Sequence, residues 1–171
     1  LAVSLVLTRS RLDIGFGSGG FLMRAAREAK LYASFRDVFG RKIEQFPMAA
    51  AQLADLEYAA KRTVATALDA YKRFEQLQNA TELEAFAMRE LILLQKIYTS
   101  KETVDKLRLA ISIFGGNGAI EDFNDIARLF RDSLVNELWE GPRNVLLAQM
   151  YRDLLKSQWS IEDVLKQMFP Q

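Results

Sequence analysis

The sequence contains neither cysteine nor histidine. Without cysteine the chain has no disulfide, no thiolate nucleophile and no cysteine-ligated metal. Without histidine it has no serine–histidine or cysteine–histidine nucleophile, no histidine-ligated zinc and no glutamate–histidine di-iron site of the kind built into helical bundles. Any acid–base chemistry must therefore use aspartate, glutamate, lysine or tyrosine. The lack of cysteine is compatible with a cytoplasmic protein, which is the location we expect.

Long hydrophobic runs and an excess of charge of one sign are also missing. Residues 1–7 are apolar but too short to span a bilayer, and they lack the basic segment and cleavage site of a signal peptide. The 23 lysine and arginine residues nearly balance the 22 aspartate and glutamate residues. This balance gives no indication of a nucleic-acid or anionic-membrane surface, so partners have to be inferred from particular sites.

Apolar residues, by contrast, are abundant. They make up 50% of the 171 residues, which indicates one domain with one substantial core. The chain begins at leucine, directly in an apolar pattern. We therefore expect residues 1–171 to be a single domain cut from a longer protein.

The spacing of apolar residues at steps of three and four predicts helices over nearly the whole chain. A first helix is predicted from residue 13 to about residue 38, ending at Phe39-Gly40. Four glycines weaken its first turns, because each costs about 1 kcal/mol relative to alanine; they are Gly15, Gly17, Gly19 and Gly20. Pro47 fits the first turn of a second helix, which ends near residue 79.

A third long helix opens at a capping box, in which Thr81 is followed by Glu84, and it closes at Gly115-Gly116. Shorter helices are predicted over residues 125–133, from Pro142 to about residue 156, and after a cap at Ser160. Long antiparallel helices joined by short connections predict an all-α protein, an up-and-down four-helix bundle with short additional C-terminal helices.

Two segments carry possible anion-binding groups. Residues 114–118 (FGGNG) form a glycine-rich turn whose backbone N–H groups can cradle phosphate, although the turn follows a helix rather than a strand. Taken alone, it is better explained as a helix end with left-handed glycines. Arg36 and Phe39 can clamp a pyrophosphate and stack on a base. A cation on the helix dipole beside a core phenylalanine explains this pair equally well.

Two further segments carry charged side chains. Arg128, Arg131 and Asp132 share one helix face and are more typical of ion pairs than of a site. Glu140 stands between Trp139 and Gly141, where an indole can shield a carboxylate from water and make it a stronger base for proton abstraction, and the glycine lets a planar substrate approach. A charged residue at a helix end is the simpler explanation of Glu140 in isolation.

Taken in order, these segments resemble the C-terminal domain of the acyl-CoA dehydrogenases, flavoenzymes that desaturate acyl-CoA thioesters. The resemblance extends over roughly residues 10–156. The tryptophan before Glu140 and the form of the first motif are most similar to the branch related to the alkylation-response flavoproteins. The matching motifs are residues 32–40 (YASFRDVFG), 53–56 (LADL), 114–118 (FGGNG), 128–132 (RLFRD) and 139–141 (WEG).

The resemblance implies a four-helix bundle that carries a homodimer or homotetramer interface, preceded in the intact protein by an α-helical and a β-domain. It implies FAD bound between subunits, with Arg36 at a phosphate, Phe39 at the adenine and the backbone of Gly115 and Gly116 at the pyrophosphate of a neighbour's cofactor. Glu140 matches the base that removes the α-proton of the acyl-CoA substrate while the β-hydride goes to the flavin. The resemblance implies no metal and does not indicate the electron acceptor.

The chain departs from the family pattern at three positions. The family often has glutamine at the positions of Pro47 and Ser112 and threonine at that of Pro142, so hydrogen-bonding groups for the cofactor are lost. Some branches place an alternative base near Ser10, where this chain has no carboxylate. A non-catalytic helical oligomerisation module derived from the family therefore remains an alternative. In either case we expect the isolated chain to be inactive and to retain FAD weakly or not at all.

Overall fold

The computed structural model describes residues 2–170, with side chains from residue 6 onward. The helices, the short strands and the turns of 3₁₀ helix (η) follow in chain order: α1 (Ala2–Phe35), β1 (Asp37–Val38), β2 (Arg41–Lys42), η1 (Ile43–Gln45), α2 (Pro47–Glu75), η2 (Gln76–Asn79), α3 (Glu82–Phe114), η3 (Gly115–Ala119), α4 (Ile126–Leu138), α5 (Arg143–Lys156) and α6 (Ile161–Met168).

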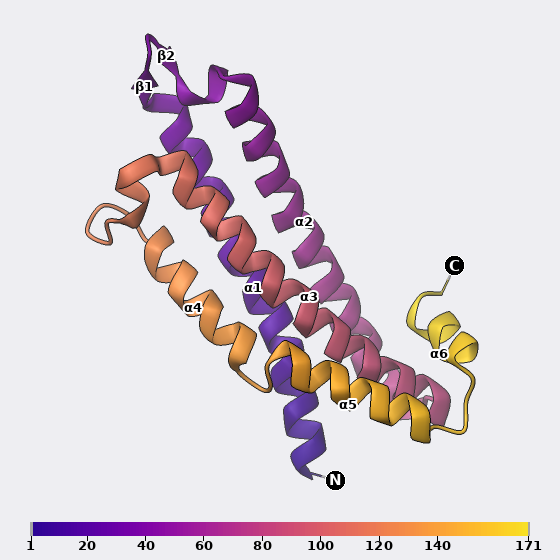
Figure 1. Cartoon of the computed structure of the whole chain (residues 1–171). Coiled ribbons are helices and arrows are strands. Elements are labelled where there is room, and N and C mark those ends of the chain that lie inside the picture. Colours follow the sequence, from indigo (N-terminus) through magenta and orange to yellow (C-terminus); the bar gives the residue numbers. More distant parts are fainter. Residues whose placement is uncertain (1, 171) are drawn as a thin grey trace.

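The helices form the predicted up-and-down bundle (Figure 1). α1 packs against α2 and α3, α4 covers α3 and α1, and α5 and α6 pack against α3. A turn after Leu138 divides the last part of the bundle into α4 and α5. The β1–β2 hairpin and the α3–α4 connection lie at one end of the bundle, whereas the α4–α5 turn lies toward the other, beside the N-terminal half of α1 (Figure 1).

The main core lies among α1, α2, α3 and α4 and is rich in small side chains, which allow the helix axes to approach closely. Its buried apolar members are Leu22, Ala25, Ala29, Tyr32, Ala33, Leu56, Ala59, Ala60, Leu107, Ala110, Ile113, Phe114 and Ile126. Within residues 2–170, no helix is long and apolar enough to cross a membrane.

The first helix differs from its predicted bounds. α1 begins at Ala2 instead of residue 13, runs without interruption through the glycines and ends at Phe35. Gly15 and Gly19 lie on its buried face, where a β carbon would come within 2.5 Å of Gln95 Nε2 and 2.8 Å of Val64 Cγ2, respectively. These glycines weaken the helix as an isolated segment, but they allow α2 and α3 to approach it.

Residues 37–42 form a β-hairpin that the sequence analysis did not predict. Val38 pairs with Arg41, so Phe39 and Gly40 make a two-residue turn. Both have positive φ, 50° and 78° respectively, as a hairpin turn that follows the twist of its strands requires.

The predicted helix signals are confirmed. Pro47 opens α2, the Thr81 hydroxyl accepts a hydrogen bond from the Glu84 N–H at 3.3 Å, and Gly115 ends α3 with φ 62°. Ser160 caps α6. The prediction for α4 was too short, because this helix continues beyond Ser133 to Leu138.

Candidate functional site

Glu140 occupies a strained turn between α4 and α5. Its φ is 59°, in the left-handed region that residues with a side chain rarely adopt, and Gly141 follows with φ 108°. Such a conformation costs on the order of 1–3 kcal/mol and persists only where the surrounding structure imposes it. Gly141 is also confined by packing, since a β carbon there would lie 2.9 Å from Leu146 Cδ2. The glycine is therefore required by the turn itself, and not only by the approach of a substrate.

Arg11 on α1 holds the turn from one side. Its Nε and Nη2 donate to the carbonyl oxygen of Glu140 at 3.3 and 3.1 Å, and Nη2 also reaches Gln149 Oε1 at 3.5 Å. Burial lowers the pKa of Arg11, while the carboxylates of Glu140 and Glu90 oppose this shift. The guanidinium thus links α1 to the backbone of the candidate base.

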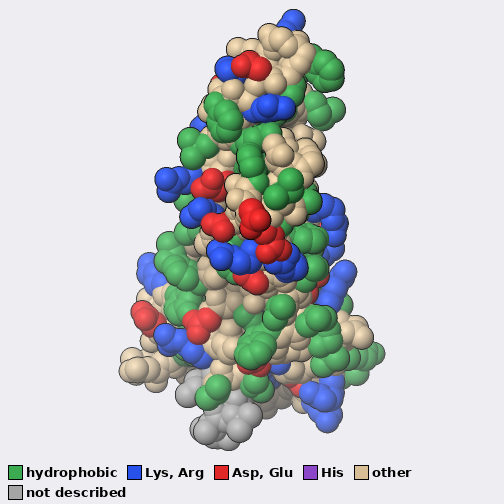
Figure 2. Space-filling model, turned by 90° about the vertical axis from the view of Figure 1, so that its left-hand side faces the viewer, with side chains coloured by type: hydrophobic (Ala, Val, Ile, Leu, Met, Phe, Trp, Pro, Cys, Tyr) green, Lys and Arg blue, Asp and Glu red, His purple; other side chains and the backbone are tan. Residues whose placement is uncertain are grey.

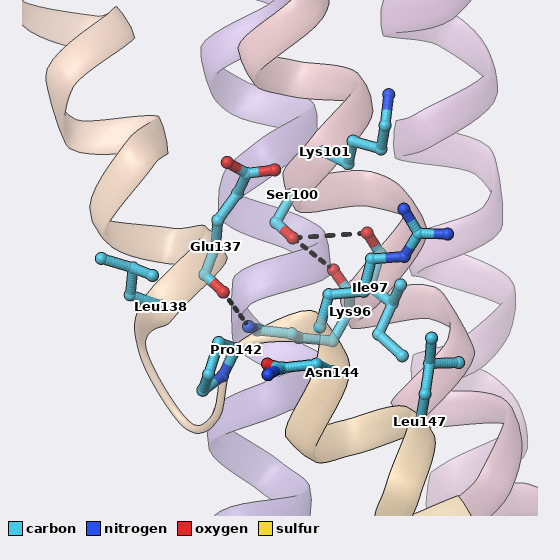
Figure 3. Close-up of a pocket in the computed structure, with 10 residues that line it drawn as sticks. Lys96, Ile97, Ser100, Lys101, Glu137, Leu138, Pro142, Asn144 and Leu147 are labelled. Atoms are coloured by element: carbon cyan, nitrogen blue, oxygen red, sulfur yellow. Dashed lines mark hydrogen bonds between the residues drawn. The ribbon is translucent and has the colours of Figure 1, made fainter.

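Lys96 on α3 holds the same turn through other carbonyl groups. Its Nζ donates to the backbone oxygens of Glu137 at 2.9 Å and Gly141 at 2.7 Å, and only 1% of its surface is exposed. Figure 3 shows the Lys96 side chain directed at the Glu137 carbonyl, at the edge of a cleft of about 400 Å³ between α3, the end of α4 and the start of α5. Glu140 does not line this cleft.

The electrostatic environment of Lys96 follows from its position. Burial, and secondarily the positive charge of Arg11, lowers the pKa of Lys96 to about 8, against the opposing effect of the Glu137 and Glu140 carboxylates. The turn between α4 and α5 is therefore bonded to two buried basic side chains, Arg11 on α1 and Lys96 on α3.

The side chain of Glu140 is half-buried. Among the described residues it takes part in no hydrogen bond or ion pair through its carboxylate. Its neighbour Trp139 is 58% exposed, and the indole Nε1 donates to Ser10 Oγ at 3.4 Å. The fold thus brings the region of Ser10, where some branches of the family place a base, beside the segment that carries Glu140.

The residues predicted at the cofactor's adenosine end lie at the opposite end of the bundle. Phe39 is 98% exposed at the hairpin tip, and Arg36 is exposed at the end of α1. Gly115 and Gly116 are exposed, and a β carbon at either would meet nothing within 4 Å. An exposed ring, an exposed guanidinium and open backbone fit the adenine and pyrophosphate of FAD.

Tyr32 joins the hairpin end of α1 to the glycine-rich turn. Its ring stacks on Phe114 with centroids 4.4 Å apart, and its hydroxyl accepts a hydrogen bond from Asn117 Nδ2 at 3.1 Å. A cleft of about 410 Å³ beside this contact is lined by Arg24 and by several carboxylates, which are Glu28, Glu121, Asp122 and Asp125. Because the acidic groups predominate, a pyrophosphate is better placed at Arg36 and the exposed glycine backbone than in this cleft.

The two ends are far apart. Arg11, which contacts Glu140, and Tyr32, which contacts the glycine-rich turn, are separated by roughly 30 Å along α1. Glu140 and the residues predicted at the adenosine end of the cofactor are therefore separated by most of the length of α1.

Strained backbone coincides with the predicted site residues. Among the described residues, Phe39 and Glu140 are the non-glycine residues with positive φ, and the positive-φ glycines are Gly40, Gly115 and Gly141. Every one of these positions falls in a motif singled out from the sequence. Strain that is retained at such positions is typical of functional sites.

The arginines of the remaining charged motif form ion pairs, as predicted, but with carboxylates that precede the motif and not with Asp132. Arg128 pairs with Asp125 at 3.2 Å, and Arg131 pairs with Glu121. Within residues 2–170, no group of acidic side chains is placed to hold a metal ion.

Sequence reasoning missed Arg11 and Lys96. Both stand at core positions of a helical pattern, Lys96 one turn after Ile92 and before Ser100, and Arg11 one turn before Gly15. A long basic side chain in a buried stripe was the available signal. Its partners, backbone carbonyls far along the chain, leave no trace in the sequence.

Together, the fold and these placements define an all-α domain with the strained turn of Glu140 near one end and an exposed hairpin tip and glycine-rich turn at the other. Residues 1–155 match the family model of the acyl-CoA dehydrogenase C-terminal domain. The chain belongs to this family.

Similarities to individual proteins agree with this family assignment. The chain is 26% identical over 160 residues to the putative acyl-CoA dehydrogenase AidB of Escherichia coli, covering 94% of this chain and 29% of that protein. It is similar to the solved apo form of Bd2924, with a TM-score of 0.87, 29% identity and coverage of 96% and 33%. It is also similar to Caenorhabditis elegans ACDH-11 solved in complex with C11-CoA, with a TM-score of 0.79, 28% identity and coverage of 89% and 26%. The chain thus spans about a quarter to a third of the length of these relatives.

Proposed function

We propose that this chain is the C-terminal domain of a longer, FAD-dependent acyl-CoA dehydrogenase, in which Glu140 is the general base. The observation that carries the proposal is the turn at Glu140, where a strained backbone is held by two buried basic side chains while the carboxylate pairs with no described side chain. A carboxylate fixed in this way presents an acceptor for a proton at a defined position.

In the proposed reaction an α,β double bond is introduced into a saturated acyl-CoA thioester. Glu140 accepts the proton from the α carbon, and the electron pair of that bond forms the new double bond. FAD, when bound, would supply the acceptor for the hydride that leaves the β carbon with its electron pair. Glu140 then returns its proton to solvent, so the base is regenerated. ACDH-11, which was solved with C11-CoA, supports an acyl-CoA thioester as the class of substrate.

The far end of the bundle supplies a second role in the same proposal. Arg36, Phe39 and the backbone of Gly115 and Gly116 would hold the adenosine and pyrophosphate of a neighbouring subunit's FAD. The separation from Glu140 favours this sharing, because one chain then contributes to two cofactor sites. Such sharing requires at least two subunits, and we propose a homodimer or homotetramer in the cytoplasm whose subunits carry α-helical and β-domains before this one.

The intact protein tests the assignment directly. We expect Glu140→Gln to abolish turnover of a panel of saturated acyl-CoA substrates that includes C11-CoA, measured with an artificial electron-accepting dye. The variant should keep its fold and its flavin absorbance. Glu162→Gln, at an exposed position on α6, is the control and should keep full activity. Unchanged turnover in Glu140→Gln would sink the assignment.

A second candidate is the non-catalytic helical oligomerisation module. The exposed apolar surface favours it. The face that includes α4 carries apolar side chains interspersed with charges of both signs (Figure 2). The exposed apolar residues of α4 and α5 include Val135, Leu138, Val145, Tyr151 and Leu155. Ser112, which stands where the family often has glutamine, also favours it, because its hydroxyl donates to the Leu109 carbonyl of its own helix at 2.6 Å instead of being free for a cofactor. Purified intact protein that oligomerises but shows no flavin absorbance would favour this module over the enzyme.

A further inference from the structure

Lys96 is a buried cation that the proposed acid–base step does not use. Its Nζ bonds to the carbonyl oxygens of Glu137 and Gly141, at 2.9 and 2.7 Å. These two residues stand three positions before and one position after Glu140. The lysine therefore spans the left-handed residue, with one hydrogen bond on each side of it.

This bridging geometry depends on the conformation of Glu140. If φ of Glu140 returned to a negative value, the chain direction after it would change and the Gly141 carbonyl would leave Nζ. Conversely, a nitrogen fixed on α3 that satisfies both carbonyls selects the conformation with φ 59°. The Glu137 carbonyl is also one of the last in α4, where the helix leaves such groups without partners and where a cation is favourable.

We propose that Lys96 is a positioning residue for Glu140, which fixes the α4–α5 turn so that the carboxylate is aligned with the α carbon of the thioester. The inference rests on the proposed role of Glu140. Arg11 supports the same turn from α1 through the Glu140 carbonyl alone, so the two cations act on different atoms.

The charges around Lys96 come from several elements. Arg11 on α1 repels it, and the carboxylates of Glu137 on α4 and Glu140 in the turn attract it. Lys96 lies on α3, next to Ile97 and one turn from Ser100, whose hydroxyl donates to the Lys96 carbonyl at 2.7 Å (Figure 3). The ammonium is thus held by neutral carbonyls, which set a direction, in addition to diffuse charge attraction.

The test compares Lys96→Met with Lys96→Gln in the intact protein, with C11-CoA or the acyl-CoA of the panel that the unaltered protein turns over fastest. Methionine fills the space but donates no hydrogen bond, whereas glutamine retains two N–H donors. We expect kcat of the methionine variant to fall about 10- to 100-fold, as for a misplacement of about 1 Å, with KM changed less than about twofold. Glutamine should restore part of kcat. The exposed Lys101→Met is the control and should leave both constants unchanged.

A deuterium isotope effect separates positioning from general loss of structure. With α-deuterated thioester, the isotope effect on kcat should rise in Lys96→Met, because proton abstraction becomes slower than the other steps. A folded Lys96→Met variant with the kcat and isotope effect of the unaltered protein would overturn the inference. If that variant does not fold, Lys96→Leu, which also lacks a donor, decides by the same criterion. An active Glu140→Gln variant would instead overturn the proposed function.

Discussion

At the residue scale, the backbone conformation determines how the candidate site side chains are presented. Glu140 and Phe39 are chemically ordinary, but both are held at positive φ, with values of 59° and 50°. Phe39 reaches this conformation in a two-residue hairpin turn, whereas Glu140 reaches it in a turn bonded to Arg11 and Lys96. In both cases the strained backbone presents a side chain that the rest of the described fold leaves at least partly exposed.

The buried Lys96 should make stability depend on pH. Its pKa is about 8 in the folded protein, below the ordinary value of 10.5. Between these values the unfolded chain binds a proton that the folded chain lacks, so the free energy of unfolding should rise with pH, by at most about 3 kcal/mol. Below pH 8 both states are protonated and this contribution to the slope vanishes. Urea unfolding from pH 7 to 10.5 measures it.

Two variants show whether the slope belongs to Lys96. Lys96→Met should remove this part of the pH dependence, whichever way its absolute stability changes. Lys101→Met, on the same helix but exposed, should retain it. Equal slopes for the unaltered protein and Lys96→Met would show that another group titrates in this range.

At the scale of elements, α1 shows how tertiary contacts can outweigh local propensity. Its glycines are separated into two sets: Gly15 and Gly19 face other helices, while Gly17 and Gly20 face open space. The first pair allows close packing against Gln95 and Val64. The second pair only weakens the helix, which is the effect expected from propensity alone.

The two sets predict opposite results for the same substitution. Gly20→Ala should raise the free energy of unfolding by about 0.5–1 kcal/mol, because the helix loses a flexible residue and gains no clash. Gly19→Ala should lower it by about 1–3 kcal/mol, since the new methyl group would lie 2.8 Å from Val64 Cγ2. Thermal unfolding of both variants measures the difference. Stabilisation by Gly19→Ala would show that α1 and α2 can separate without loss.

At the scale of the whole molecule, the bundle keeps its candidate sites apart. The turn at Glu140 is linked to the N-terminal part of α1 through Arg11, and the glycine-rich turn is linked to its C-terminal part through Tyr32. α1 thus keeps the two candidate sites apart along the bundle.

The isolated chain should therefore bind FAD weakly or not at all and should have no dehydrogenase activity. The contacts that we propose for the cofactor are an exposed ring, an exposed arginine and open backbone, which the described residues do not enclose. Titration of the 171-residue chain with FAD, followed by flavin fluorescence, should show no saturable binding, while the intact protein carries flavin. A tight yellow complex of the isolated chain would contradict this expectation.

The sequence by itself determined the helical class, the order of the helices and most of their ends. Pro47, the Thr81–Glu84 capping box and Gly115 act on their immediate neighbours, so their effects are readable without a structure. The ordered motifs likewise indicated the family and the candidate residues. Only the tertiary structure decided that α1 continues through its glycines and that Arg11 and Lys96 hold the turn of Glu140. These features depend on contacts between residues about 40 to 130 positions apart, whose approach depends on how the helices pack and not on local pattern.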